Sequence, residues 1–191
     1  MGEALLAAGS EFFNPDLAAK RLIQDNPGLP LQEANSRAWQ LGFDGLLRAL
    51  KNGGTYAFES TLGARSITQA LIEGARNGAM IELHFTGLDS PERHMARVAA
   101  RVGKGGHDIP EEKIRQRYVS SRENLIRLVP AITNLFVYDN SIEADPELGP
   151  PEPVLLLQVE DRKLVYAIEP ERVPQWAKAA YVAVHAAYSA R

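Results

Sequence analysis

Residues 80–102, MIELHFTGLDSPERHMARVAARV, contain a complete strand-to-helix step and decide the fold class. The opening residues, 80–85, are rich in types that favour strands, and the sequence predicts a β-strand there. Pro91 and Glu92 are typical of the first turn of a helix, so a helix is predicted over residues 91–102. A strand that leads into a helix in this way is typical of an α/β protein.

The same alternation continues on both sides of this segment. Further strands are predicted at residues 11–14, 55–59 and 135–138. Strands separated by helices need right-handed crossovers, which favours a mostly parallel sheet with helices on both faces and ligands at the carboxyl ends of the strands. The other predicted helices are the end of one at 4–8, then 15–24, 31–51 (one long helix, or two broken near Gly42 and Gly45), 66–76, and one from Glu111 onwards.

The last fifty residues follow a different pattern. Proline, glutamate and glycine dominate residues 143–153, which indicates a linker or a surface loop. A hairpin of strands 154–159 and 163–168 is predicted next, followed by a final helix over 174–190. We therefore expect two domains, a core over residues 1–141 and a C-terminal extension over 142–191.

Composition limits the classes of function. A chain of 191 residues with 45% apolar and 24% charged residues can bury one substantial core. The net charge of −3 gives no global reason to expect nucleic acid or an anionic membrane as partner. The absence of cysteine excludes disulfides and thiol catalysis, and no apolar run is long enough to cross a bilayer. Cytoplasm is the expected location, because no signal-type segment opens the sequence.

Residues 103–118, GKGGHDIPEEKIRQRY, combine a glycine-rich loop with a helix start that carries Arg115 and Arg117. Glycine permits backbone conformations that other residues avoid, so this segment is predicted to be a hinged, positively charged flap. His107 and Asp108 fall short of the ligand set that a metal ion needs, so we predict that they lock the loop and bind no metal.

Several short motifs occur in one order between Ala4 and Ser141. They are residues 13–16, 56–62, 88–92, 97–102, 105–110 and 138–141. Each motif is weak alone, but the ordered set closely resembles the zeta-toxin-like P-loop kinases, a group also called predicted ABC-type ATPases. The resemblance implies a P-loop kinase-like fold that transfers a phosphoryl group from ATP or GTP, with Mg²⁺, to a small-molecule acceptor such as UDP-N-acetylglucosamine. It also raises an antitoxin protein as a partner.

The resemblance gives the flap, about residues 102–117, the role of a lid over the nucleotide phosphates. Arg101 and Arg115 are then the catalytic arginines, with Arg97 and Arg117 as further phosphate ligands. A planar guanidinium can hold two phosphate oxygens at once, which suits phosphoryl transfer. The alternative is structural: these arginines pair with Glu92, Glu111 and Glu112 on solvated helix faces.

The same resemblance assigns the acceptor side of the reaction. Asp16 corresponds to the carboxylate that takes the proton of the acceptor hydroxyl, although a capping role for Asp16 or Asn14 explains the pattern equally well. Glu59 corresponds to the acidic residue that binds acceptor hydroxyls, and its alternative is a solvated charge at the end of a strand. By the same resemblance, Ser60 and Thr61 line the acceptor pocket. Asp139 and Asn140 lie where related kinases hold the nucleotide base, although turn chemistry explains this pair equally well.

One element of the family is missing from the 191 residues. The phosphate loop G-x-x-x-x-G-K-[ST] does not occur, and the chain's one Gly-Lys pair is followed by Gly105 rather than serine or threonine. We expect the first strand and this loop to lie upstream of Met1, and the chain as given to bind ATP weakly or not at all. Two functions stay open: a small-molecule kinase, or a non-catalytic binding module or relic that keeps the acceptor pocket or a surface for a protein partner.

Overall fold

The structure is a computed structural model that describes residues 12–103, 106, 108–143 and 152–189. The chain divides into two compact units, Met1–Thr61 and Leu62–Arg191. Each unit is considered by itself below. The helix end predicted at residues 4–8 lies outside the described residues.

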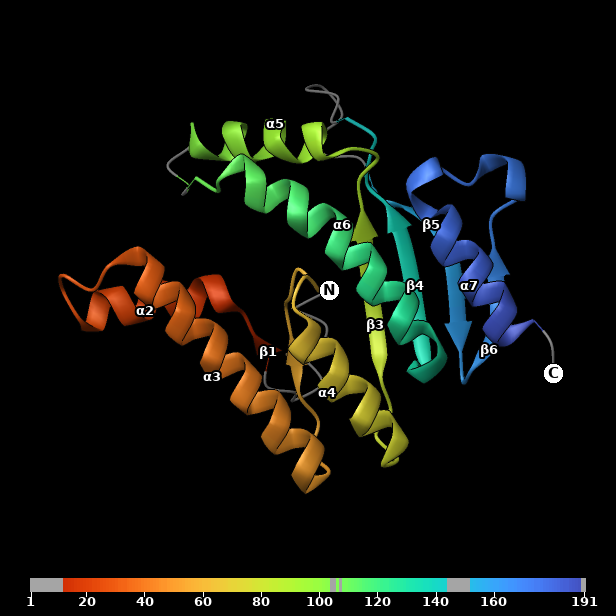
Figure 1. Ribbon diagram of the computed structural model, residues 1–191, viewed down its shortest axis with the longest axis horizontal. Coiled ribbons are helices and arrows are strands. Elements are labelled where there is room, and N and C mark those ends of the chain that lie inside the picture. The colour runs from red at the N-terminus through yellow and green to blue at the C-terminus, as the bar shows by residue number, and fades with distance from the viewer. Residues whose placement is uncertain (1–11, 104–105, 107, 144–151, 190–191) are drawn as a thin grey trace. The chain divides into compact units, whose positions relative to one another are not determined.

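The first unit pairs a short parallel ladder with two packed helices (Figure 1). Strands β1 (Phe12–Phe13) and β2 (Ala57–Phe58) run parallel, as expected from the strand-helix alternation. Helices α2 (Pro15–Asp25) and α3 (Leu31–Asn52) pack through alanines whose small side chains allow close approach. The core alanines are Ala19, Ala34 and Ala38, each at most 2% exposed.

Helix α3 is one continuous helix, which resolves the choice between one helix and two. Gly42 and Gly45 do not break it, because both positions face aromatic rings of the same unit. A β-carbon at Gly42 would lie 2.6 Å from the Phe13 ring, and one at Gly45 would lie 2.6 Å from the Tyr56 hydroxyl. These glycines therefore serve close packing rather than a turn.

The second unit contains a four-stranded sheet in the order β3-β4-β5-β6. Strands β3 (Glu82–Gly87) and β4 (Asn134–Asp139) are parallel, whereas β5 (Val154–Glu160) and β6 (Lys163–Ala167) continue the sheet antiparallel. The α/β class is confirmed, and the sheet of this unit is mixed rather than mostly parallel. The C-terminal hairpin makes the sheet mixed, because its strand β5 lies antiparallel to β4. The hairpin strands are themselves antiparallel, since the short turn at Asp161 and Arg162, with φ of 45° and 61°, can join only antiparallel strands.

The C-terminal segment thus belongs to the same sheet as β3 and β4. Helices α6 (Glu111–Leu128) and α7 (Lys178–Tyr188) lie against one face of this sheet (Figure 1), while α4 (Arg65–Arg76) and α5 (Pro91–Val102) pack on α6. Helix α7 starts later than the predicted residue 174, because residues 175–177 form a 3₁₀ turn first. The core of the unit is made of fully buried side chains, including Leu128, Leu135, Val137, Leu157, Val159 and Val184.

None of the helices in the described part of the chain combines the length and the apolar character that a membrane crossing requires.

Candidate functional site

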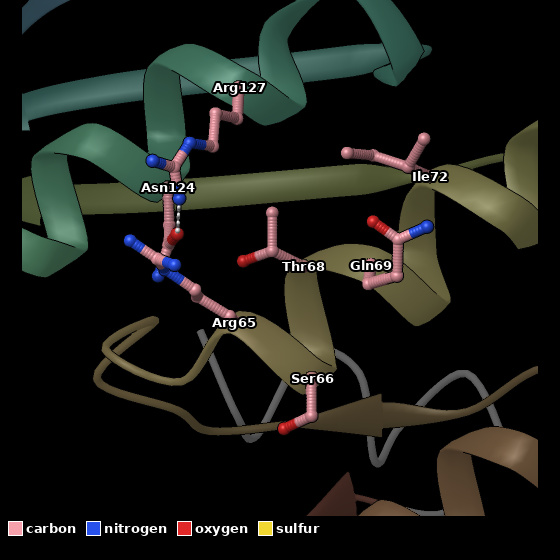
Figure 2. Close-up of a pocket in the computed structure, with 7 residues that line it drawn as sticks. All are labelled: Arg65, Ser66, Thr68, Gln69, Ile72, Asn124 and Arg127. Atoms are coloured by element: carbon pink, nitrogen blue, oxygen red, sulfur yellow. Dashed lines mark hydrogen bonds between the residues drawn. The ribbon is translucent and has the colours of Figure 1, made fainter.

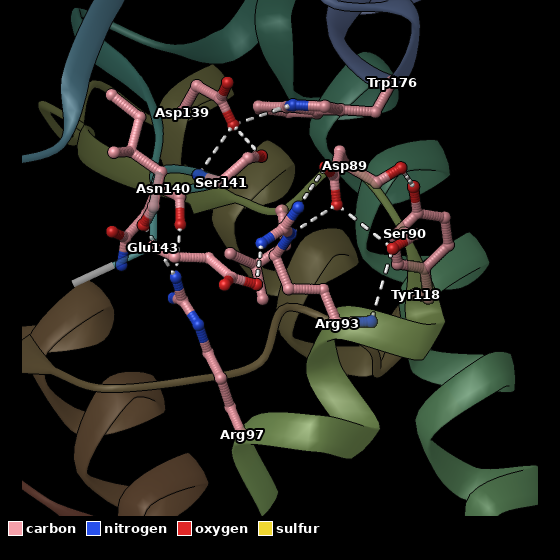
Figure 3. A network of polar contacts seen from close by, with 12 residues as sticks. Asp89, Ser90, Arg93, Arg97, Tyr118, Asp139, Asn140, Ser141, Glu143 and Trp176 are labelled. Carbon is pink, nitrogen blue, oxygen red and sulfur yellow. Dashed lines mark hydrogen bonds and ion pairs between the residues drawn. The ribbon is translucent and has the colours of Figure 1, made fainter. Parts of the chain in front are cut away.

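A network of polar contacts lies at the carboxyl ends of β3 and β4 (Figure 3). The parallel register places Gly87 beside Asp139, so the loops that follow the two strands begin side by side. The backbone N–H of Asn140 donates to the Gly87 carbonyl at 2.9 Å, which extends the contact into the loop. This edge is one of the places where an α/β sheet binds its ligands.

Arg93 fixes the loop after β3. Its Nε and Nη2 donate to the two carboxylate oxygens of Asp89 at 2.8 and 3.0 Å, and its Nη1 donates to Glu143 at 2.6 Å. These charge-assisted bonds favour the ionised carboxylate and lower the pKa of Asp89. Ser90 caps α5, since its Oγ accepts from the Arg93 N–H at 3.2 Å. Sequence reasoning missed Arg93, although its spacing of four from Asp89 was a usable signal.

Asp139 holds the loop after β4. Its Oδ1 accepts hydrogen bonds from the Ser141 N–H at 3.2 Å, from the Ser141 hydroxyl, and from Trp176 Nε1 at 3.1 Å. Trp176 comes from the C-terminal segment, and its ring packs against Gly87. The loop predicted to lie at the nucleotide base is thus anchored by a residue that no motif singled out.

Arg122 of α6 supports the same edge. Its guanidinium carbon lies 3.4 Å from the centre of the Tyr118 ring and 5.2 Å from that of Trp176. Its Nη2 donates to the Leu88 carbonyl at 2.7 Å, while the Tyr118 hydroxyl donates to the Asp89 carbonyl at 2.7 Å. Burial lowers the pKa of Arg122, but the two ring faces and the carbonyls keep the cation in place.

The four predicted phosphate-binding arginines differ in their surroundings. Arg115 donates to Glu92 at 2.7 Å and to Glu111 at 2.9 Å, so it joins α5 to α6 as the structural alternative predicted. Arg97 reaches the loop after β4, with its Nη2 at 2.7 Å from the Asn140 carbonyl and 3.3 Å from that of Ile142. Within the described part of the chain, Arg101 and Arg117 form no ion pair.

The predicted lid begins at the end of α5. Gly103 ends this helix with a right-handed φ of −59°. The Gly106 N–H donates to the Arg101 carbonyl at 3.0 Å, and a β-carbon at Gly106 would lie 2.9 Å from that oxygen. Gly106 is therefore needed for a close backbone approach to α5, whereas Gly105 and His107 lie outside the described residues.

The acceptor-side residues belong to the first unit, where Asn14 links one of them, Glu59, to the start of α2. The Asn14 Oδ1 accepts from the Leu17 N–H at 3.0 Å and so caps α2, while its Nδ2 donates to Glu59 Oε2 at 2.5 Å. The Glu59 N–H also donates to the Phe13 carbonyl at 3.0 Å. Asp16 lies exposed in the first turn of α2. The carboxyl ends of β1 and β2 thus bring a helix start and a carboxylate together, and Asn14, not Asp16, is the cap.

Comparisons with known proteins place the chain in a family. No protein-family model and no solved structure matches it. A protein of Haemophilus influenzae, described as an uncharacterized protein, is 34% identical over 104 residues, which are 54% of this chain and 71% of that protein. The chain therefore belongs to the same family as this Haemophilus influenzae protein. Because the relative's description names no activity, the zeta-toxin-like resemblance stays a prediction.

Proposed function

We propose that this protein is a zeta-toxin-like phosphotransferase that moves a phosphoryl group from ATP or GTP to a hydroxyl of a small molecule. The observation that carries the proposal is the Asn14 amide, which spans the start of α2 and the Glu59 carboxylate at 3.0 and 2.5 Å. Through it, the start of α2, which carries Asp16, is joined to Glu59 at the carboxyl ends of parallel strands, where α/β enzymes bind substrates.

The acceptor residues have separate roles in this proposal. Asp16 accepts the proton of the attacking hydroxyl, and its exposed position in the first turn of α2 leaves it open to a substrate. Glu59 holds neighbouring hydroxyls of the acceptor, with its orientation set by the Asn14 amide. Ser60 and Thr61 extend this hydroxyl-binding surface. UDP-N-acetylglucosamine is the first acceptor to test, because the resemblance points to it.

The arginines supply positive charge to the phosphates. Arg97 already contacts the loop of Asn140, which is the expected base region. Arg115 would exchange its exposed carboxylate partners for phosphate oxygens, since its side chain is 42% exposed and exposed ion pairs are weak. Arg101 and Arg117 have no ion pair to break within the described residues. No three carboxylate or imidazole groups converge in the described part of the chain, so no step is assigned here to Mg²⁺.

The test is a phosphorylation assay with ATP or GTP against a panel of sugar nucleotides. It is run on this chain and on the product of the longest reading frame that contains it. Asp16→Asn is expected to lower kcat by about 100-fold or more, because a positioned general base contributes that much. Asp25→Asn, which changes another exposed carboxylate of α2, is the matched control. Undiminished turnover in Asp16→Asn would remove Asp16 from the mechanism, and no phosphorylated product from either protein would overturn the proposal.

A second candidate is a binding module that keeps the acceptor surface without catalysis, or a surface for an antitoxin-like protein. The observation in its favour is that Arg115 and Arg93 each pair with two carboxylates of the protein itself, so both cations already have structural partners. Calorimetric titration of the same panel without nucleotide separates the candidates. Acceptor binding that depends on Glu59, with no turnover in either protein, would favour the module.

A further inference from the structure

A groove between α4 and α6 in the second unit is lined by polar and cationic side chains (Figure 2). Its volume is about 490 Å³, within the range of small-molecule sites. Residues on both helices contribute to it, and those that matter here are Arg65, Ser66, Thr68, Ile72, Asn124 and Arg127.

The charged side chains that line the groove are all positive. Arg65 and Arg127 come from facing helices, and none of the described residues that line the groove is a carboxylate. Arg37, Arg93 and Arg115 each pair with a carboxylate, but neither Arg65 nor Arg127 has such a partner among the described residues. Two cations held at one opening repel each other, and a bound anion would remove that repulsion.

The inner wall of the groove is built from buried polar groups. Asn124 is 1% exposed and Thr68 is 3% exposed. The Asn124 Nδ2 donates to the Leu62 carbonyl at 2.8 Å, which fixes the amide, and its Oδ1 faces Arg127 Nη1 at 3.4 Å. Asn124 therefore places a fixed amide oxygen beside Arg127, while the Thr68 hydroxyl has, among the described residues, only a long contact of 3.4 Å with the Ala64 carbonyl. Polar side chains this deeply buried are normally well hydrogen-bonded, so a ligand oxygen would suit Thr68.

The start of α4 adds donors to the same place. No side-chain cap is present at Ala64, and among the described residues no side chain accepts from the N–H groups of the first turn of α4, where Arg65 and Ser66 line the groove. Free N–H groups and the helix dipole both favour an anion. The uncapped start of α4 therefore adds to the evidence from the two arginines and the buried Asn124 amide, and it would not indicate an anion site by itself.

We propose that this groove binds the phosphoryl group of a small phosphate monoester. Guanidinium groups can hold two phosphate oxygens each, and Arg65 and Arg127 present them from opposite sides. Ile72 offers an apolar surface for the organic part of the ligand. None of the residues proposed for phosphoryl transfer lines the groove, so this inference stands apart from that function.

NMR titration at constant ionic strength tests the proposal, with glucose 6-phosphate and inorganic phosphate as separate probes. Both should produce saturable shifts at the amides of Ser66 and Thr68 and at the side-chain NH₂ of Asn124, with tighter binding of the monoester. Arg65→Gln and Arg127→Gln should each weaken binding by about tenfold, since a hydrogen bond between charged groups contributes that much. Arg76→Gln, an exposed arginine at the other end of α4, is the matched control and should leave affinity unchanged.

Three outcomes would overturn the proposal. The first is the absence of saturable shifts at these groups in the wild type. The second is equal affinity in the wild type and in the variant that carries both substitutions, provided its amide spectrum remains that of a folded protein. The third is binding of inorganic phosphate with exclusion of the monoester. No nucleotide or acceptor is used, so failure here would not bear on the proposed phosphotransferase activity.

Discussion

The indole of Trp176 lies so close to Gly87 that a β-carbon at position 87 would come within 2.3 Å of the ring. Gly87 ends β3, and Trp176 belongs to the turn before α7, so the C-terminal segment packs directly on the end of the parallel strand pair. The same indole donates to Asp139 at the end of β4. The polar network of Figure 3 therefore depends on a residue outside the motifs that resemble a kinase.

We predict that Gly87→Ala destabilises the protein by about 1–3 kcal/mol, because the methyl group must displace a packed ring. Urea unfolding followed by circular dichroism measures this change. Gly103→Ala is the matched control: its β-carbon would lie 3.6 Å from the Ala100 carbonyl, an ordinary contact, and its φ suits alanine. In a double-mutant cycle, Trp176→Ala should relieve part of the Gly87→Ala penalty. Additive effects would show that the ring does not restrict position 87.

The Asn14 side chain makes two hydrogen bonds, and different substitutions can remove both of them or only one. Asn14→Ala removes the cap of α2 and is expected to cost about 1 kcal/mol. Asn14→Ser keeps a capping oxygen but is too short to donate to Glu59, so most of the stability should return. Thermal unfolding measures both variants. If acceptor binding exists, it should weaken in Asn14→Ser as well, because Glu59 loses the amide that orients it. Equal stability of the two variants would contradict the capping role.

His94 provides a test by pH. Burial, and after it the charges of Arg122 and Arg97, lowers the pKa of His94 below the ordinary 6.5. The unfolded chain therefore takes up a proton first, and stability should fall as the pH drops from 6.5 towards the folded-state pKa. Arg97→Gln should raise the pKa of His94 without restoring 6.5, since burial remains the larger cause. An NMR titration of the His94 imidazole measures this pKa directly. If Arg97→Gln leaves the pKa unchanged, the charge of Arg97 does not act on His94.

The matched control for the histidine titration is Arg101→Gln. Arg101 lies on the same helix, four residues after Arg97, but it is not among the charges that act on His94. We therefore expect this variant to leave the pKa of His94 unchanged.

Substitution of Arg115 can distinguish a structural role of this residue from a catalytic one. Its ion pairs with Glu92 and Glu111 are exposed and screened by salt, so Arg115→Gln should change the melting temperature little. If Arg115 also binds nucleotide phosphates, the same variant should lose most phosphotransferase activity, and Arg115→Lys should not restore it. Activity and melting temperature that fall together would support the structural role alone.

Local chemistry made much of the fold predictable. The helix Pro91–Val102 has the predicted bounds, because Pro91, Glu92 and the preceding Ser90 define a helix start through groups only a few residues apart. Helix α6 likewise begins at Glu111 as predicted, directly after Pro110. The hairpin 154–167 was predictable from its short polar turn. The mixed sheet was not, since the edge that a hairpin joins depends on packing across the unit.

The candidate sites, like the fold, were predictable from the sequence only where they depend on residues close together in the chain. The sequence by itself determined most of the secondary-structure elements and showed that polar residues follow the strands, because both depend on neighbours along the chain. Only the tertiary structure decided that Arg115 meets Glu92, that Trp176 meets Asp139, and that Arg65 faces Arg127. These partners lie far apart in the sequence, and which of many similar charges meet is decided by how the helices pack on the sheet.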